Sequence, residues 1–149
     1  MIDHVQIACP PGSEEVLRGY YRDLLGLTEK PKPPRLAVRG GCWFTGHGIE
    51  LHLGVEEDFR PARKAHPGLL WPDLDGLAAR LAVAGYEVTW ADPAELDEWS
   101  REPTDATATD GDPRATERGN HHVRRFHAHD PYGNRLEFLT KDPQDHRKS

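Results

Sequence analysis

The sequence DPYGNRLEFL, residues 130–139, combines a tight turn with an alternating strand. In the first half, Pro131 fixes the backbone φ angle and Gly133 can adopt the positive φ that such turns require. In the second half, polar Arg135 and Glu137 alternate with apolar residues, which is the period of a strand with one buried face. Glu137 therefore points away from the core in mid-strand, where a partly buried carboxylate needs a partner.

Composition narrows the class of protein. The chain has 149 residues, enough for one domain with a real core, and a net charge of −6. An acidic chain does not offer the basic face that nucleic acid requires, so we expect no nucleic-acid partner. No apolar run reaches the length of a membrane span, and no secretory signal is visible at the N-terminus. Two cysteines without metal-ligand spacing favour a reduced, cytoplasmic protein.

The first half of the chain reads as a strand, a helix and a group of strands. Strand 2–8 places His4 on the face opposite its large apolar residues. A helix is predicted over 13–26, because apolar residues recur there at helical spacing. Further strand segments are predicted at 27–30, 36–39, 42–45 and 49–53. In the last of these, Glu50 and His52 share the face opposite the apolar residues.

The second half repeats this order after a connector at 55–65. A strand is predicted over 66–71. The helix that follows begins at Asp73, a good N-cap, and ends at Gly85. The remaining strands are predicted at 86–91, 123–129 and 135–139.

An insert at 95–122 interrupts the second half. It is acidic, rich in Thr, Asp, Gly and Pro, and poor in apolar residues. A segment of this composition and length is usually exposed or functional, so we expect a surface loop or a mobile lid. The polar tail, 141–149, is expected to fray.

Each half opens with a histidine near the start of a strand and closes with a glutamate in mid-strand. His4 and Glu50 take these places in the first half, and His66 and Glu137 take them in the second. The spacing between His66 and Glu137 is longer than that between His4 and Glu50 by about the length of the insert. We therefore predict an α+β fold of two βαβββ modules, each too small to bury its own sheet face alone. The predicted boundaries are about 1–54 and 66–140 for the modules, 55–65 for the linker, 95–122 for the inserted loop and 141–149 for the tail.

Five stretches resemble the vicinal oxygen chelate superfamily, which includes glyoxalase I, fosfomycin-resistance thiol transferases, bleomycin-resistance proteins and extradiol dioxygenases. They are IDHV (2–5), YRDLLGL (21–27), GIEL (48–51), WPDLD (71–75) and DPYGNRLE (130–137). The resemblance implies a single domain over 1–149, in which the two modules form a cupped mixed sheet. It also implies a homodimer.

The same resemblance implies a metal site. The four metal positions of glyoxalase I match His4, Glu50, His66 and Glu137, whereas the thiol transferases use only the equivalents of His4, His66 and Glu137. Two imidazoles with one or two carboxylates suit one divalent metal per site, either Zn, Ni, Mn or Fe, with positions left open. Glu137 and Glu50 are then the candidate catalytic carboxylates, because a carboxylate beside the metal can move a proton.

Three further residues are candidates for binding a substrate. If 130–134 closes a hairpin, His127 lies near Glu137 on the same face, and Arg125 flanks it by parity. The Arg125 guanidinium suits an anionic group on a substrate. Gln6 shares the face of His4 and would line the same pocket.

These expectations lead to one preferred function and its alternatives. The preferred function is a glyoxalase-like, metal-dependent isomerase, lyase or related enzyme that acts on a small molecule with adjacent oxygens. The first alternative is a metal-free protein that sequesters an antibiotic, as bleomycin-resistance proteins do, with acidic walls around a cationic ligand. The second is a non-catalytic regulatory module. A dioxygenase is less favoured, because extradiol dioxygenases of this type usually carry two such domains in one chain.

Overall fold

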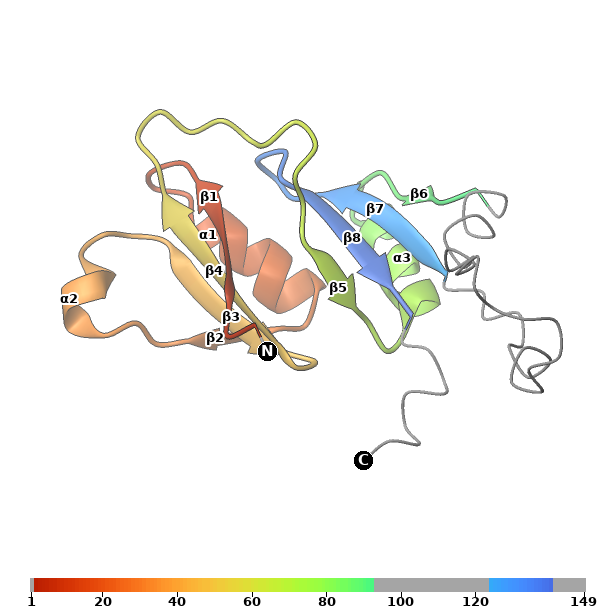
Figure 1. Ribbon diagram of the computed structural model, residues 1–149, viewed down its shortest axis with the longest axis horizontal. Helices are drawn as coiled ribbons and strands as arrows, with labels where there is room; N and C mark the ends of the chain where they lie inside the picture. The colour runs from red at the N-terminus through yellow and green to blue at the C-terminus, as the bar shows by residue number, and fades with distance from the viewer. Residues whose placement is uncertain (1, 93–123, 141–149) are drawn as a thin grey trace, which may run out of the picture.

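Two four-stranded sheets, each with its own helices, form the chain (Figure 1). The computed structural model describes residues 2–92 and 124–140. The first half consists of β1 (Val5–Cys9), α1 (Glu14–Leu17), the π-helix η1 (Arg18–Leu24), β2 (Thr28–Lys30), α2 (Pro34–Ala37), β3 (Cys42–Gly46) and β4 (Ile49–Val55). The second half consists of β5 (Gly68–Leu70), α3 (Leu74–Val83), β6 (Thr89–Trp90), β7 (Arg125–His129) and β8 (Arg135–Leu139). We call these halves the first and second modules; they confirm the predicted α+β class and the predicted repeat.

The strand order is the same in both sheets. The first sheet runs β1-β4-β3-β2 and the second runs β5-β8-β7-β6. In each sheet the first strand is parallel to the last strand, and the other neighbouring pairs are antiparallel. The histidine that precedes the first strand of a module is therefore placed beside the strand that carries its glutamate. This topology explains why the repeated histidine and glutamate positions belong together.

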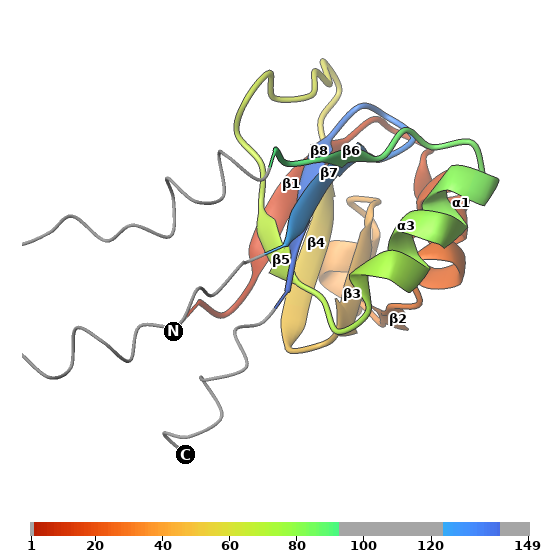
Figure 2. The ribbon, with the colours of Figure 1, turned by 90° about the vertical axis from the view of Figure 1, so that its right-hand side faces the viewer.

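One face of the strand layer is covered by helices and the other carries the candidate site residues. Figure 2 shows α1 and α3 on the same side of the strands. The apolar residues of β8, Leu136 and Phe138, are fully buried in the core, and so are Leu51 and Leu53 of β4. Alternation then directs Glu137, with its neighbours of the same parity, to the face away from the core. The predicted orientation of Glu137 is confirmed.

The helix of the first module differs from the regular one predicted over 13–26. After a single α-helical turn it widens into η1, where the amide of Leu25 donates to the carbonyl of Tyr20 at 2.9 Å. The Ser13 hydroxyl does not cap the helix but donates to the Pro10 carbonyl at 2.6 Å. The predicted end is correct, because Gly26 adopts φ +77° directly after the helix.

Four predicted strands differ from the structure by three residues or more. Strand 2–8 becomes β1, Val5–Cys9, so that His4 precedes it. Segment 36–39 is not a strand, because α2 forms over Pro34–Ala37 with a proline at its first position, where the missing N–H costs nothing. Strand 86–91 is reduced to β6, Thr89–Trp90. Strand 66–71 is reduced to β5, so that His66 lies just outside the ladder. Of these segments only 86–91 alternates clearly, and strand pairing also depends on partners elsewhere in the chain.

A buried polar network joins the two modules at the turn between β7 and β8. Asp130 is 4% exposed and accepts hydrogen bonds from the Tyr21 hydroxyl at 2.8 Å and from Asn134 Nδ2 at 2.9 Å. Its other oxygen accepts the backbone amides of Tyr132 and Asn134, both at 2.9 Å. Asn134 Nδ2 also donates to the Ala8 carbonyl of β1 at 2.9 Å. The predicted turn chemistry thus does more than reverse the chain, because it links the second module to β1 and η1 of the first.

Two predictions lie outside the described residues. They concern the inserted loop, 95–122, and the frayed tail, 141–149. The predicted site residues all lie within the described parts of the chain.

Candidate metal centre

Glu137 lies at the centre of a cluster on the face of β8 that points away from the helices. In the strand register it is opposite His127 on β7 and beside Gly68 on β5. Gly68 lies directly beside the carboxylate, since a Cβ at that position would be in ordinary contact with Glu137 Oε2, at 3.5 Å. The Glu137 amide donates to the Pro67 carbonyl at 3.1 Å, and this bond holds the segment that carries His66 against β8.

Three basic side chains surround the Glu137 carboxylate. His66 Nε2 lies 3.4 Å from Oε2, His127 Nε2 lies 3.6 Å from Oε1, and Arg125 Nη1 lies 3.3 Å from Oε1. The Glu137 side chain is only 12% exposed. Burying a carboxylate to this extent is costly unless charge partners compensate for the lost hydration. We call these four residues the second-module cluster.

The donor set of this cluster fits a divalent metal ion. The ligand atoms of His66, His127 and Glu137 all lie within 4.8 Å of one another. Ligands at 2.0–2.2 Å from a shared ion are about 3 to 3.5 Å apart. The 3.4 Å between His66 and Glu137 lies within this range, and the 3.6 Å between His127 and Glu137 lies just above it. Burial, followed by repulsion from Arg135, lowers the pKa of His127, and a neutral imidazole has the lone pair that a metal requires.

A separate cluster occupies the corresponding face of the first module. Lys30 Nζ contacts both oxygens of Glu50, at 2.8 and 2.9 Å, and His52 Nε2 lies 3.0 Å from Oε1. The hydrogen bond from Lys30 and the one from His52 lower the pKa of Glu50. Glu50 is therefore an ionised carboxylate at neutral pH, and a cation already balances its charge.

His52 organises the rings of this first-module cluster. It is 6% exposed, and its ring stacks on His4 with centroids 4.2 Å apart and on Trp43 with centroids 4.1 Å apart. The Nδ1 atom of His4 lies 2.8 Å from the Asp3 carboxylate, which orients the imidazole as partners of metal-binding histidines do. His52 thus holds His4 from one side while it bonds to Glu50.

The structure brings the predicted site residues together in two groups rather than one. His66, Glu137, His127 and Arg125 meet in the second module, and His4 and Glu50 share the first. Within residues 2–92 and 124–140, the metal-capable group with mutually close ligand atoms contains neither His4 nor Glu50. Gln6 is exposed and is the partner of His52 in the strand register. Its side chain packs against Gly54, in the space that a Cβ at that position would occupy.

Sequence reasoning missed Lys30, and it took Trp43 only as a core or pocket-wall residue. Both lie on the same face as His52, because the register aligns Lys30 with Trp43 and Trp43 with His52 across β2, β3 and β4. Lys30 falls in the predicted short strand 27–30, and parity within that strand was the available signal. The pairing of β2 with β3, which carries Lys30 to Glu50, could not be read from the local pattern.

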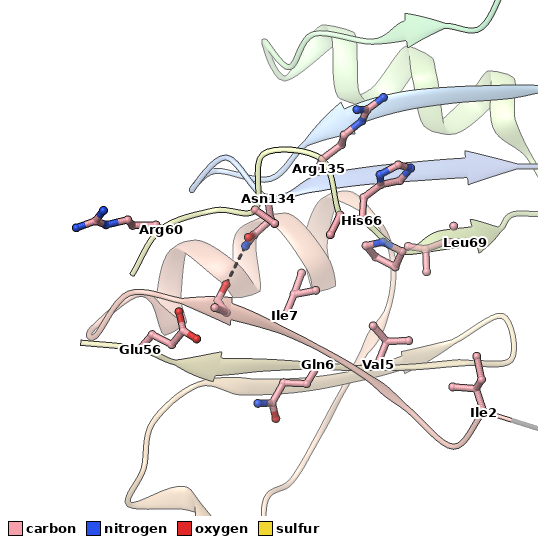
Figure 3. A pocket seen from close by; sticks show the side chains of 15 residues that line it. Ile2, Val5, Gln6, Ile7, Glu56, Arg60, His66, Leu69, Asn134 and Arg135 are labelled. Carbon is pink, nitrogen blue, oxygen red and sulfur yellow. Dashed lines mark hydrogen bonds between the residues drawn. The ribbon is translucent and has the colours of Figure 1, made fainter. Parts of the chain in front are cut away.

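A groove of about 650 Å³ separates β1 from the start of β5 and β8. Figure 3 shows Val5 and Ile7 on one side of β1 and Gln6 on the other. His66 and Arg135 belong to the lining of the groove, so it reaches the residues next to Glu137. Its volume is in the range of small-molecule sites.

Comparison with known proteins gives the family. A crystal structure of a protein from Bacillus anthracis, described as a glyoxalase family protein, is 36% identical in sequence, with 95% of each chain covered and a TM-score of 0.71. This chain belongs to the glyoxalase family. Neither a protein-family profile nor a curated protein sequence matches it.

Other solved structures share the fold of this glyoxalase-family chain at lower identity. The fosfomycin resistance protein FosX from Listeria monocytogenes is 9% identical, with 97% of this chain and 96% of that chain covered and a TM-score of 0.60. TnmS3, an antibiotic binding protein from Streptomyces sp. CB03234, is 20% identical, with 95% and 98% covered and a TM-score of 0.55. Together with the Bacillus anthracis protein, they confirm the predicted vicinal oxygen chelate fold. The function is not fixed by them, because one fold hosts many chemistries.

None of the helices in the described part of the chain combines the length and the apolar character that a membrane crossing needs.

Proposed function

We propose that this glyoxalase-family chain is a divalent-metal-dependent isomerase, lyase or related enzyme acting on a small molecule with adjacent oxygens. The observation that carries the proposal is the Glu137 carboxylate, 12% exposed and placed between the imidazoles of His66 and His127. Two imidazoles and a carboxylate suit Zn, Ni, Mn or Fe and leave coordination positions open for a ligand. When bound, such an ion supplies a Lewis acid that polarises a carbonyl oxygen.

The residues around the proposed metal have separate tasks. Arg125 and Arg135 place positive charge next to the site. Arg125 would hold an anionic group of the substrate in addition to its ion pair with Glu137. Glu50 is ionised and can accept a proton. Lys30 stabilises the negative charge of the carboxylate until the proton is transferred. Gln6 and the apolar wall of β1 would line the substrate space. We place the enzyme in the cytoplasm.

Metal analysis tests this proposal directly. Protein purified without chelator and without an affinity tag is expected to contain near-stoichiometric Zn, Ni, Mn or Fe. Addition of the same ions to the stripped protein should raise its melting temperature, because a ligand that binds only the folded state stabilises it. Absence of bound metal together with absence of stabilisation by any of these ions would contradict the proposal.

A metal-free binding protein is the second candidate function. The groove of about 650 Å³, with the apolar side chains of Val5, Ile7 and Leu69 in its wall, favours it. The fold is shared with TnmS3, which is an antibiotic binding protein. The two histidines of the second-module cluster argue against it, since neutral imidazoles add little to the capture of a cationic ligand. The metal analysis above separates the two functions.

We further propose that the complete site forms between two chains of a homodimer. His4 and Glu50 lie in one module and His66 and Glu137 in the other, and neither of the first pair joins the close group around Glu137. Either module can pair with its own partner or with the copy on a second chain, provided the chains are related by a two-fold axis. His4 and Glu50 of one chain would then face His66 and Glu137 of the other.

Cysteine cross-linking distinguishes a shared site from one built within a chain. A variant carrying both His4→Cys and His66→Cys is treated with a short bifunctional thiol reagent and run on a denaturing gel. We expect a band at twice the monomer mass, because the two positions meet between chains. The native Cys9 and Cys42 are fully buried, and burial raises the pKa of both thiols, that of Cys42 to about 11, so they react slowly.

The controls are the wild type and each single-cysteine variant, which should remain at the monomer mass. A cross-link that forms but leaves the protein at monomer mass would show an intrachain site. Failure to cross-link at all would show that the two positions do not meet. Either result contradicts the shared site.

A further inference from the structure

His127 stands apart from the four positions that the family resemblance assigns to the metal. It lies on β7, directly opposite Glu137 in the antiparallel register. Its Nε2 atom lies 3.6 Å from Glu137 Oε1, and its ring meets that of His66 edge to face, with centroids 5.1 Å apart. The side chain is 18% exposed, so the imidazole is held within the cluster and not on the free surface.

We infer that His127 is itself a metal ligand, so that the second module of one chain supplies three ligands, two histidines and one glutamate, to the shared site. The inference rests on the proposed metal dependence. It assigns to His127 a direct bond to the ion, whereas sequence analysis gave it only a contact with substrate.

The geometry around the carboxylate supports this assignment. His66 approaches Oε2 of Glu137, and Arg125 approaches Oε1 at 3.3 Å. A metal-binding carboxylate commonly uses one oxygen for the ion and accepts a hydrogen bond on the other. Arg125 can therefore keep Oε1 while Oε2 turns to an ion shared with His66 and His127, whose ligand atoms all lie within 4.8 Å.

The state of Glu50 supports the same conclusion from the other module. Both of its oxygens contact Lys30, and one also contacts His52. Coordination by Glu50 would require the lysine to be displaced from the carboxylate. The imidazole of His127 instead faces Glu137, its partner in the strand register, with Nε2 3.6 Å from Oε1. It can therefore provide the ligand that Glu50 would otherwise supply. Two histidines and one carboxylate are the donor set typical of Fe(II), with three positions left open.

Cobalt(II) binding tests this role without any assay of activity. The wild type, His127→Gln and His129→Gln are each titrated with Co(II) under anaerobic conditions, and affinity is measured by competition with a chelator. His129 is the matched control, because it lies two residues along the same strand and is exposed. We expect His127→Gln to lose more than about 100-fold in affinity, beyond the loss caused by removing a residue that only supports a ligand, and to change the visible absorption spectrum, with His129→Gln unchanged.

A second pair of variants gives a positive signal. In His127→Cys, a thiolate bound to Co(II) should add a sulfur-to-metal charge-transfer band in the near ultraviolet, whereas His129→Cys should not. Circular dichroism checks that each variant is folded. This band remains informative if the glutamine variant is poorly folded.

The outcomes separate this inference from the proposed function. If His127→Gln keeps the wild-type affinity and spectrum, or His127→Cys shows no new band while binding Co(II), His127 is not a ligand, although the metal-dependent function stands. If the wild type itself binds no Co(II), both fail.

Discussion

Glu137→Gln is expected to lower the affinity for a divalent metal by more than about 100-fold. Loss of a residue that only supports a ligand costs about 10–100-fold, and loss of the anionic ligand itself should cost more. Glutamine keeps the shape of the side chain but removes the charge that lies between His66 and His127. Isothermal titration with Zn, or competition with a chelator when binding is tight, measures the effect.

The matched control for this variant is Glu15→Gln, which removes an exposed carboxylate on α1, on the helix-covered side of the strands (Figure 2). Its metal affinity should equal that of the wild type. Glu137→Gln also removes the ion pair between Glu137 and Arg125, which can affect stability. The melting temperatures of both variants without metal therefore show whether the fold is intact. Wild-type affinity in folded Glu137→Gln would refute the candidate metal centre.

Asp130→Ala is expected to lower the free energy of unfolding by about 3–5 kcal/mol, because each buried donor left without an acceptor costs about 1–3 kcal/mol. Asp130 is 4% exposed and accepts four hydrogen bonds, among them those from the buried Tyr21 hydroxyl and from Asn134 Nδ2. Its removal leaves these donors without an acceptor in a site closed to bulk water. Urea unfolding followed by tryptophan fluorescence gives the free energy of unfolding.

Two further variants show whether the loss of stability in Asp130→Ala comes from the buried network. Asp58→Ala removes an aspartate that is almost fully exposed, so its effect on the free energy of unfolding should stay within about 0.5 kcal/mol. Tyr21→Phe combined with Asp130→Ala should be less destabilising than the sum of the single changes, because the two residues share a bond. A loss below about 1 kcal/mol for Asp130→Ala would show that the network does not hold the modules together.

Local patterns predicted much of the fold because the forces behind them act over a few residues. The turn at 130–134, the alternation that buries Leu136 and Phe138, and the Asp73 cap, whose carboxylate accepts the Gly76 amide at 2.9 Å, were all found as expected. The same parity placed Glu137 and His127 on one face. The error at 36–39, where α2 forms over Pro34–Ala37, falls in a short segment without strong periodicity. Segment 86–91 alternates, but only Thr89–Trp90 pairs with β7.

The partners of each candidate residue were decided by tertiary structure. Sequence alone determined that His4, Glu50, His66 and Glu137 recur in matching places of two modules. Only the pairing of distant strands showed that Lys30 neutralises Glu50 and that His127 joins His66 at Glu137. An ion pair or a metal site depends on distances of a few ångströms between residues far apart in the chain. Their spacing in the sequence gives these distances only after the strand register is known.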